Sequence, residues 1–449
     1  MTAPRALALL LTALAAAGGA RAQQPPPADT AAARATQLPN VRRVMLQEAL
    51  ELARRNNPAM VQAQQNVRVS DMATMQAWGA YLPSVSGSMS TSKSGQRIDA
   101  TTGSVTRAPL AYNDRYGLSA SVPVFTGFQR GANRRLANAN VQMNEAALIN
   151  QRYTTDLATK QAFFNALATQ ELVTVAETQV RRSQEQLKLT SEKLRLGATT
   201  RADSLQAQVD YGTQQLALIQ AQANAQNAQA TLARAVGVVG SVAAVPDTML
   251  EVRIASLDTA SLRREALANA PAVVQAEAGV TASRASVAVS RASYMPTITA
   301  SGSTSWARAD SVFLGGQPFS RSWQVALQLS LPIFNGFSRE AQLVQADANL
   351  VTAQARLRDA RLLLDANLTQ ALAALDAAAR QIDVSRTQVA AAQENLRMQR
   401  ERYRLGASTI VDMLTAEVST NQAEVGLVQA RYSYLVARAQ LEAYVGHAL

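Results

Sequence analysis

The chain has 449 residues, no cysteine and one histidine, and its formal net charge is +11. The absence of cysteine excludes disulfides, thiolate metal sites and a thiol nucleophile, and a lone histidine at position 447 lacks the neighbours that a catalytic or metal site requires. We therefore expect no enzyme activity, no cofactor and no metal. Basic and acidic residues alternate at helical spacing, so nucleic acid is not an expected partner.

The N-terminus has the order of a secretory signal peptide over residues 1–22. Arg5 is followed by an apolar core, residues 6–17, and by the small-residue cleavage site Ala20-Arg21-Ala22. Residues 23–45 contain three consecutive prolines and predict an extended periplasmic leader. Beyond the signal no run of about 18 apolar residues follows, so no transmembrane helix is expected.

The first half, residues 46–257, predicts helices around one β-hairpin. In the hairpin, Tyr116, Leu118 and Val122 alternate with Gly117 and Ser119, the period of two that indicates a strand. Such a strand fits either an outer-membrane barrel wall or a soluble sandwich with one wet face. The expected order is helix 46–78, hairpin 82–125 with strands 82–93 and 116–124, long helix 126–196, return helix 200–236 and equatorial linker 237–257.

The second half, residues 258–449, predicts the same elements again. Trp323, Val325 and Leu327 alternate with Gln324 and Gln328 in its hairpin. The expected order is a helix, hairpin 295–334 with strands 297–306 and 323–331, long helix 335–405 and return helix 409–446. The predicted loops of the two hairpins cover 94–113 and 307–322.

Both long helices are free of proline for about 70 residues, which gives rods of roughly 100 Å. Such rods are typical of a coiled coil or a helical tube rather than a globular core. Val180, Leu187 and Leu194 are spaced by seven, with small side chains such as Ser183 and Thr190 between them. This pattern predicts close, supercoiled helix packing.

The halves are a tandem duplication. Tyr81 and Tyr294 lie 213 residues apart, whereas Gly197 and Gly406 lie 209 apart, so the offset changes only across the hairpin loop. In each half the two shorter helices together match the length of the rod, so one chain supplies four helical columns and four strands. Open sheet edges are forbidden in a bilayer, and more than about eight strands are needed for a lumen. The predicted fold class is therefore mainly α with a transmembrane β-barrel part: a long α-helical barrel and a 12-stranded β-barrel, formed by a trimer.

Several motifs resemble the outer-membrane efflux protein (TolC-like) family. They include Gln47-Glu48-Ala49-Leu50, the Tyr-Leu-Pro entry to the first hairpin, and residues 403–414, which read YRLGASTIVDML. The resemblance covers essentially the whole mature chain. It implies an outer-membrane homotrimer with a long periplasmic extension, which contacts outer-membrane lipid. It also implies docking on a periplasmic adaptor (membrane fusion) protein and an inner-membrane pump or exporter.

The resemblance also implies roles for the two helix-turn tips as the gate and the adaptor contact. Asp412 matches an aspartate that rings the pore, but Thr415 stands at the family's next acidic position. Ser408 stands where an arginine ties the closed gate, whereas Asp203 and Tyr403 match the tethering partners of that arginine. The implied adaptor contacts are Leu196, Gly197, Ala198, Thr199, Leu405, Gly406, Ala407 and Ser408.

Simpler interpretations exist for the same residues. Thr200-x-x-Asp203 and Thr409-x-x-Asp412 fit capping boxes, and the tip glycines fit helix C-caps. The expected function is a passive duct for small molecules such as drugs and toxic compounds, leaving a Gram-negative cell. The alternatives are a type I protein-secretion channel and, in a different class, a periplasmic coiled-coil scaffold that never enters a membrane.

Overall fold

A computed structural model describes residues 42–94, 111–246, 259–313 and 315–447 of the chain. The predicted signal peptide, most of the predicted leader, the tip of the first hairpin and part of the predicted linker lie outside the described residues. The elements treated below belong to one unit, Arg43–Leu449, which contains all but the first residue of strand β1.

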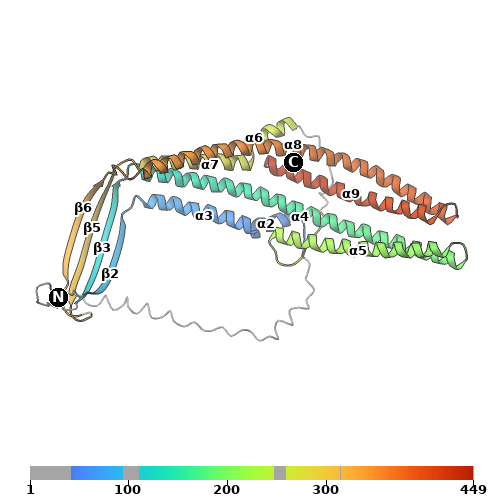
Figure 1. Ribbon diagram of the computed structural model, residues 1–449, viewed down its shortest axis with the longest axis horizontal. Coiled ribbons are helices and arrows are strands. Elements are labelled where there is room, and N and C mark those ends of the chain that lie inside the picture. The colour runs from blue at the N-terminus through green and yellow to red at the C-terminus, as the bar shows by residue number, and fades with distance from the viewer. Residues whose placement is uncertain (1–41, 95–110, 247–258, 314, 448–449) are drawn as a thin grey trace. The chain divides into compact units, whose positions relative to one another are not determined.

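The two halves have matching elements (Figure 1). Each long helix has 67 residues and each return helix has 36, which confirms the tandem repeat. The first half comprises β1 (Arg42–Val44), α2 (Leu46–Asn56), α3 (Pro58–Gly79), β2 (Ser84–Ser94), β3 (Ala111–Phe125), α4 (Gln129–Arg195), α5 (Arg201–Val236) and β4 (Val242–Ala244). The second comprises α6 (Thr259–Asn269), α7 (Pro271–Ala292), β5 (Thr297–Asp310), β6 (Ser320–Ser330), α8 (Ser338–Arg404) and α9 (Ile410–Val445).

The helix predicted over 46–78 is interrupted where α2 ends and α3 begins. Asn57 between them is extended, with ψ 126°. Pro58 disfavours the helical conformation in the residue that precedes it and cannot donate a backbone hydrogen bond. The Asn57 side chain instead caps α3 by accepting from the backbone N–H of Ala59 at 2.9 Å. The second half is broken in the same way before Pro271.

The four hairpin strands form one antiparallel sheet in the order β2-β3-β5-β6. The strands extend further than predicted, because β3 begins at Ala111 rather than 116 and β5 runs to Asp310 rather than 306. The cause is pairing on both sides of β3, which continues outward to Ala111 opposite Ser94 of β2 and to Tyr112 opposite Asp310 of β5.

The two faces of this sheet differ in chemistry. One face carries small hydroxyls from neighbouring strands; Ser86 and Ser119 share a hydrogen bond at 2.7 Å, and Ser305 and Ser322 another at 2.8 Å. The opposite face is apolar and exposed, with Val85, Met89, Leu118, Trp323, Val325, Leu327 and Leu329. A polar face opposite an apolar one is the pattern of a membrane β-barrel wall.

Two consecutive left-handed residues turn each sheet strand into the long helix that follows it. They are Gly127 and Phe128 in the first half (φ 58° and 67°), and Gly336 and Phe337 in the second (φ 65° and 64°). The phenylalanine ring packs edge-on against the last aromatic residue of the hairpin at 5.5 Å in both halves. The same strained turn therefore occurs twice, as expected from the duplication.

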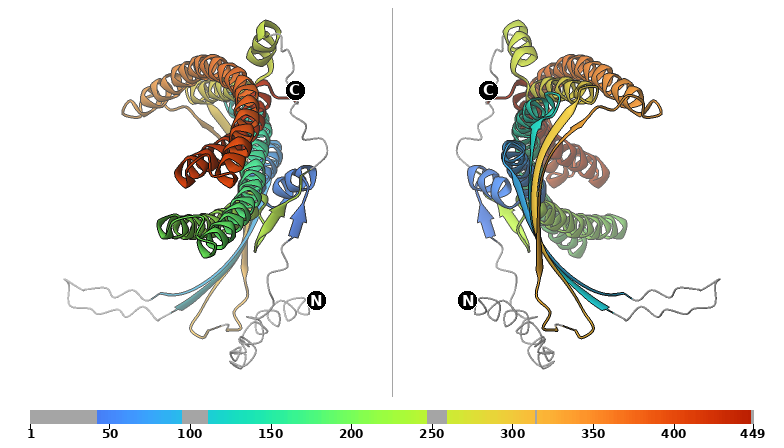
Figure 2. Two further views of the ribbon diagram at one scale, coloured as in Figure 1. Left: turned by 90° about the vertical axis from the view of Figure 1, so that its right-hand side faces the viewer. Right: turned by 90° about the vertical axis from the view of Figure 1, so that its left-hand side faces the viewer.

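The main core lies where both halves meet at the middle of the helical layer. Phe163 and Leu232 from the first half and Leu368 and Leu441 from the second are fully buried there. The short strands β1 and β4 pair with each other and bury Val44 and Val242 in the same core. Figure 2 shows the helices of both halves following one arc. Among the described residues, none of the helices combines the length and apolar character that crossing a membrane requires.

Candidate functional site at the two helical tips

Each tip is a tight turn closed by glycine. Gly197 and Gly406 adopt φ 71° and 76°, and the following residue reaches back to the helix it has just left. Ala198 donates its backbone N–H to Lys193 at 2.8 Å, and Ala407 donates to Arg402 at 2.8 Å. These bonds satisfy helix C-terminal carbonyls, so the glycines are C-caps as expected. They leave Leu196 and Leu405 each 76% exposed at the end of the molecule.

The two predicted aspartates cap the return helices. In the first tip, Asp203 and Thr200 form a reciprocal capping box with both distances 3.2 Å. In the second tip, Asp412 accepts from the backbone N–H of Thr409 at 3.1 Å and from its hydroxyl at 2.8 Å.

These bonds favour the ionised carboxylates. The Thr199 hydroxyl and then Thr200 hold the pKa of Asp203 below its ordinary value. The Thr409 hydroxyl, then its N–H, does the same for the pKa of Asp412. Both tips therefore carry a fixed negative charge at a helix N-terminus, where the helix dipole also favours it.

Among the residues that the structure describes, the other predicted gate residues make no hydrogen bond to these aspartates. Thr415 is exposed, and its hydroxyl donates to its own helix, to the carbonyl of Val411 at 2.8 Å. Ser408 is half-buried and lies 3.5 Å from the carbonyl of Gln399. Tyr403 is buried, and its hydroxyl has no hydrogen-bond partner among the residues that the structure describes. The structure therefore shows no hydrogen bond between the hydroxyl of Tyr403 and Asp203.

Lys193, which sequence reasoning did not single out, joins the two tips. It lies in the last turn of α4, and its Nζ donates to the backbone carbonyl of Tyr403 at 2.8 Å. The same ammonium lies 4.3 Å from the centre of the Tyr403 ring, a cation–π contact. Tyr403 also packs with Ala207 of α5 and with Ile410 and Met413 of α9. The only signal in the sequence was a basic residue at a helix C-terminus, which is common.

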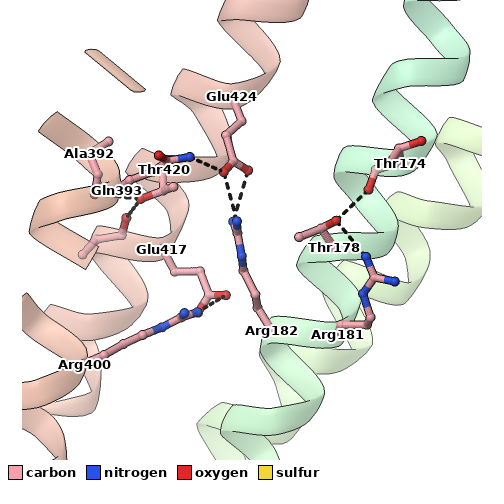
Figure 3. Close-up of polar contacts among 11 residues, drawn as sticks. Thr174, Thr178, Arg181, Arg182, Ala392, Gln393, Arg400, Glu417, Thr420 and Glu424 are labelled. Atoms are coloured by element: carbon pink, nitrogen blue, oxygen red, sulfur yellow. Dashed lines mark hydrogen bonds and ion pairs between the residues drawn. The ribbon is translucent and has the colours of Figure 1, made fainter. Parts of the chain in front are cut away.

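A second polar contact links the halves farther from the tips, along the seam where α4 lies against α9 (Figure 3). Arg182 of α4 donates to Glu424 of α9 from both terminal guanidinium nitrogens, Nη1 and Nη2, at 3.1 and 3.0 Å. Gln393 of α8 donates to the same carboxylate at 3.2 Å. Arg400 of α8 lies 3.5 Å from the carboxylate of Glu417 on α9. We refer to these five residues as the seam cluster.

The seam cluster occurs where α4 meets α9, and the repeat does not reproduce it in the counterpart helices α8 and α5. At the 209-residue offset, Arg182 corresponds to Ala391, and Glu424 corresponds to Gln215. The counterpart helices α8 and α5 therefore lack this ion pair. Within the described residues no group of three or more His, Cys, Asp or Glu could hold a metal ion.

Comparisons with known proteins agree with this architecture. The family model described as outer membrane efflux protein matches residues 49–238 and 262–447, one match in each half. The chain is 29% identical to Protein CyaE of Bordetella pertussis over 326 residues, 71% of this chain and 66% of that protein. It is 25% identical to Outer membrane efflux protein BepC of Brucella suis, over 87% of this chain and 82% of that protein.

A solved structure shares the fold. The Campylobacter jejuni CmeC outer membrane channel matches with a TM-score of 0.75 at 19% identity, over 89% of this chain and 85% of that one. The predicted fold class and location, the outer membrane with a long periplasmic extension, are thereby confirmed. Two family matches, two structural repeats and a shared channel fold lead to one conclusion: the chain belongs to the outer membrane efflux protein family.

Proposed function

We propose that three copies of this chain close into a duct that carries small molecules out of a Gram-negative cell. The observation that carries this proposal is that helices at the two sides of the chain lack the neighbours that their repeat counterparts have. Helix α7 packs against both α4 and α8, whereas its counterpart α3 packs against α4 and has no comparable contact with α8 among the described residues. Likewise, α9 packs along both α4 and α8, whereas α5 packs along α4 and has no comparable contact with α8 among the described residues; it approaches α8 at the tip, where Ala207 and Tyr403 share one cluster.

Apolar side chains lie exposed on these incompletely packed helices. On α5, Leu205, Val209, Leu216 and Ile219 are 53–69% exposed and follow one helical stripe. On the opposite side of the chain, α8 exposes Val344, Val351 and Leu362. Such stripes are typical of contact surfaces between proteins, and we infer that a second copy of the chain covers them. The repeat therefore supports α8 of one copy lying between α3 and α5 of the next.

The turns between sheet and helices support the same arrangement. A Cβ at Gly127 would lie 2.3 Å from Met295 of the second half, whereas nothing lies within 4 Å of one at Gly336. The counterpart of Met295 is Leu82, which is 68% exposed. In the proposed trimer, Gly336 of one copy faces Leu82 of the next, as Gly127 faces Met295 within the chain.

The sheet would close in register with the helices. Strands β2 and β6 are its edges, and the four-strand order places β6 of one copy antiparallel to β2 of the next. Three copies give twelve strands with the hydroxyl face inside and the apolar face against outer-membrane lipid. Twelve strands leave a lumen, because about eight are already filled by side chains.

The helical tips would serve as gate and docking surface. Three copies of Asp412 would converge on the axis and favour cations; Asp203, Tyr403, Ser408 and Thr415 would lie around them. The exposed turns at residues 196–199 and 405–408 would contact a periplasmic adaptor, which connects the duct to an inner-membrane pump or exporter. Energy for transport would come from that transporter.

Mass measurement of the detergent-purified protein tests the assembly. We expect a trimer, and we expect Leu216→Glu to dissociate it because a charge would replace the middle of the α5 stripe. Ala217→Glu is the matched control, since Ala217 is also exposed but lies off the stripe. Recovery of the wild-type protein as a soluble species without detergent would favour the periplasmic scaffold instead.

Gene deletion in the native host tests the cargo. Increased susceptibility to several unrelated drugs, restored by the wild-type gene, supports a small-molecule duct. Unchanged drug susceptibility together with loss of one secreted protein from the medium would identify the chain as a protein-secretion channel.

A further inference from the structure

Glu417 is a glutamate buried near the second tip, and one of its two carboxylate oxygens lacks a hydrogen-bond partner among the described residues. Its side chain lies on α9 and the residue is 3% exposed. One oxygen, Oε1, is 3.5 Å from Nη2 of Arg400, and the other, Oε2, has no hydrogen-bond partner among the residues that the structure describes. A buried ionised carboxylate in such a state is costly, whereas the protonated form is not.

The charged groups around Glu417 do not compensate this cost. Arg400 faces it from α8, Arg182 from α4, Asp210 from α5 and Glu424 from α9. Arg182 is already bound at both nitrogens by Glu424 (Figure 3), and Arg400 is 39% exposed to solvent. The two remaining groups are acidic and repel a negative charge. Burial first, opposed by Arg400, raises the pKa of Glu417 above its ordinary value.

The position of Glu417 makes its protonation depend on how the halves pack. It lies beside the ion pair between α4 and α9, and the counterpart position on α5 is Gln208, which cannot ionise. We propose that Glu417 is a proton switch of the α4–α9 seam: it binds a proton when the seam is packed and releases it to solvent when the two tips part. The role of this parting as gate opening rests on the proposed function.

The direction of the pH effect follows from the geometry. In the packed seam the pKa of Glu417 is raised above 4.5, and in the parted, hydrated seam it returns towards that ordinary value. The packed state therefore binds the proton more tightly, so acid favours packing. As the pH rises from the ordinary value through the raised one, parting becomes more favourable by up to about tenfold per pH unit for each copy.

Spin labels at the tips test the switch without relying on transport. The chain has no cysteine, so Leu196→Cys and Leu405→Cys place labels only at the two exposed turns. In the detergent-solubilised full chain we expect the distance between labels to shift to longer values as the pH rises from the ordinary glutamate pKa of 4.5 through the raised pKa of Glu417. Glu417→Gln, a neutral mimic of the protonated side chain, should keep the short distance throughout.

Glu401→Gln is the matched control, because Glu401 is an exposed carboxylate near the same tip that pairs with Arg404; it should keep the wild-type shift. Two results would overturn the proposal: a label distance in the wild type that does not change with pH, or a label distance in Glu417→Gln that still changes with pH. The first result concerns the wild type alone, so it holds even if the variant folds poorly. Conductance in planar bilayers then separates the two ideas: a pH-dependent distance without any conductance supports the switch but contradicts the duct.

Discussion

The ion pair between Arg182 and Glu424 offers the sharpest test of how the two halves hold together. Both side chains are largely covered, with 22% and 14% of their surface exposed, and the guanidinium makes two parallel bonds to the carboxylate. Arg182→Met keeps a stem of similar length against the neighbouring helices but removes both donors. Of its hydrogen bonds to described residues, the carboxylate of Glu424 then retains only the one from Gln393.

The magnitude follows from the burial and the geometry. A hydrogen bond to a charged group contributes about 1.5–3 kcal/mol, and partial exposure reduces the total for the pair. We expect the substitution to destabilise the packed seam by about 2 kcal/mol, which shifts the ratio of parted to packed seams about 30-fold in each copy. Replacing Glu424 by Gln in the same protein should recover part of this loss, because no unpaired carboxylate would remain.

Single-channel recording in planar bilayers measures the shift as open probability. Arg181→Met is the matched control: Arg181 is the adjacent residue, is exposed, and donates to Thr178 of its own helix at 3.1 Å (Figure 3). It removes the same charge without touching α9. An Arg182→Met channel with wild-type open probability, or an equal effect of both substitutions, would refute the assignment of the α4–α9 pair as a tie.

Other substitutions address the tips. Asp412→Asn should abolish the cation preference measured by reversal potentials. In the wild type this preference should persist as the pH falls through the ordinary pKa of an aspartate, because hydrogen bonds hold the pKa of Asp412 below that value. An unchanged reversal potential in the variant would exclude a pore role. Lys193→Met removes the cation on Tyr403 and should raise open probability about fivefold, which corresponds to about 1 kcal/mol. An unchanged open probability would show that the apolar contacts of Tyr403 hold the two tips together without Lys193. Gly406→Ala, at φ 76°, should cost about 1 kcal/mol and speed hydrogen exchange at the second tip, whereas Gly212→Ala inside α5 should slow exchange there.

Local patterns in the sequence predicted most of the fold. Period-two alternation located the hairpins, and long stretches without proline located the 67-residue helices, because both signals depend only on neighbouring residues. The ends of β3 and β5 are missed, since Asn113 and Asp114 are polar and belong to a strand because they pair with β2 on one side and with β5 on the other.

Contacts between distant helices could not be read from the same patterns. Arg182 and Glu424 are 242 residues apart, and each resembles an ordinary charged residue on a solvated helix face. The seven-residue spacing was recognised, but in α4 the small residues Ser183 and Thr190 are the buried ones, whereas Leu187 is only partly covered. Which stripe of a helix faces a neighbour is decided by the assembly of all helices.

The restriction of the seam cluster to one junction has a consequence for how such a protein can change over time. In a ring of six identical subunits, any substitution that loosens one interface loosens all six. A duplicated chain instead contains two classes of interface, one between α4 and α9 within the chain and, in the proposed trimer, one between α8 and α5 of different copies. Ionic residues can therefore change at the α4–α9 interface while the interface between copies keeps its apolar contacts. Substitutions can then alter opening without weakening assembly.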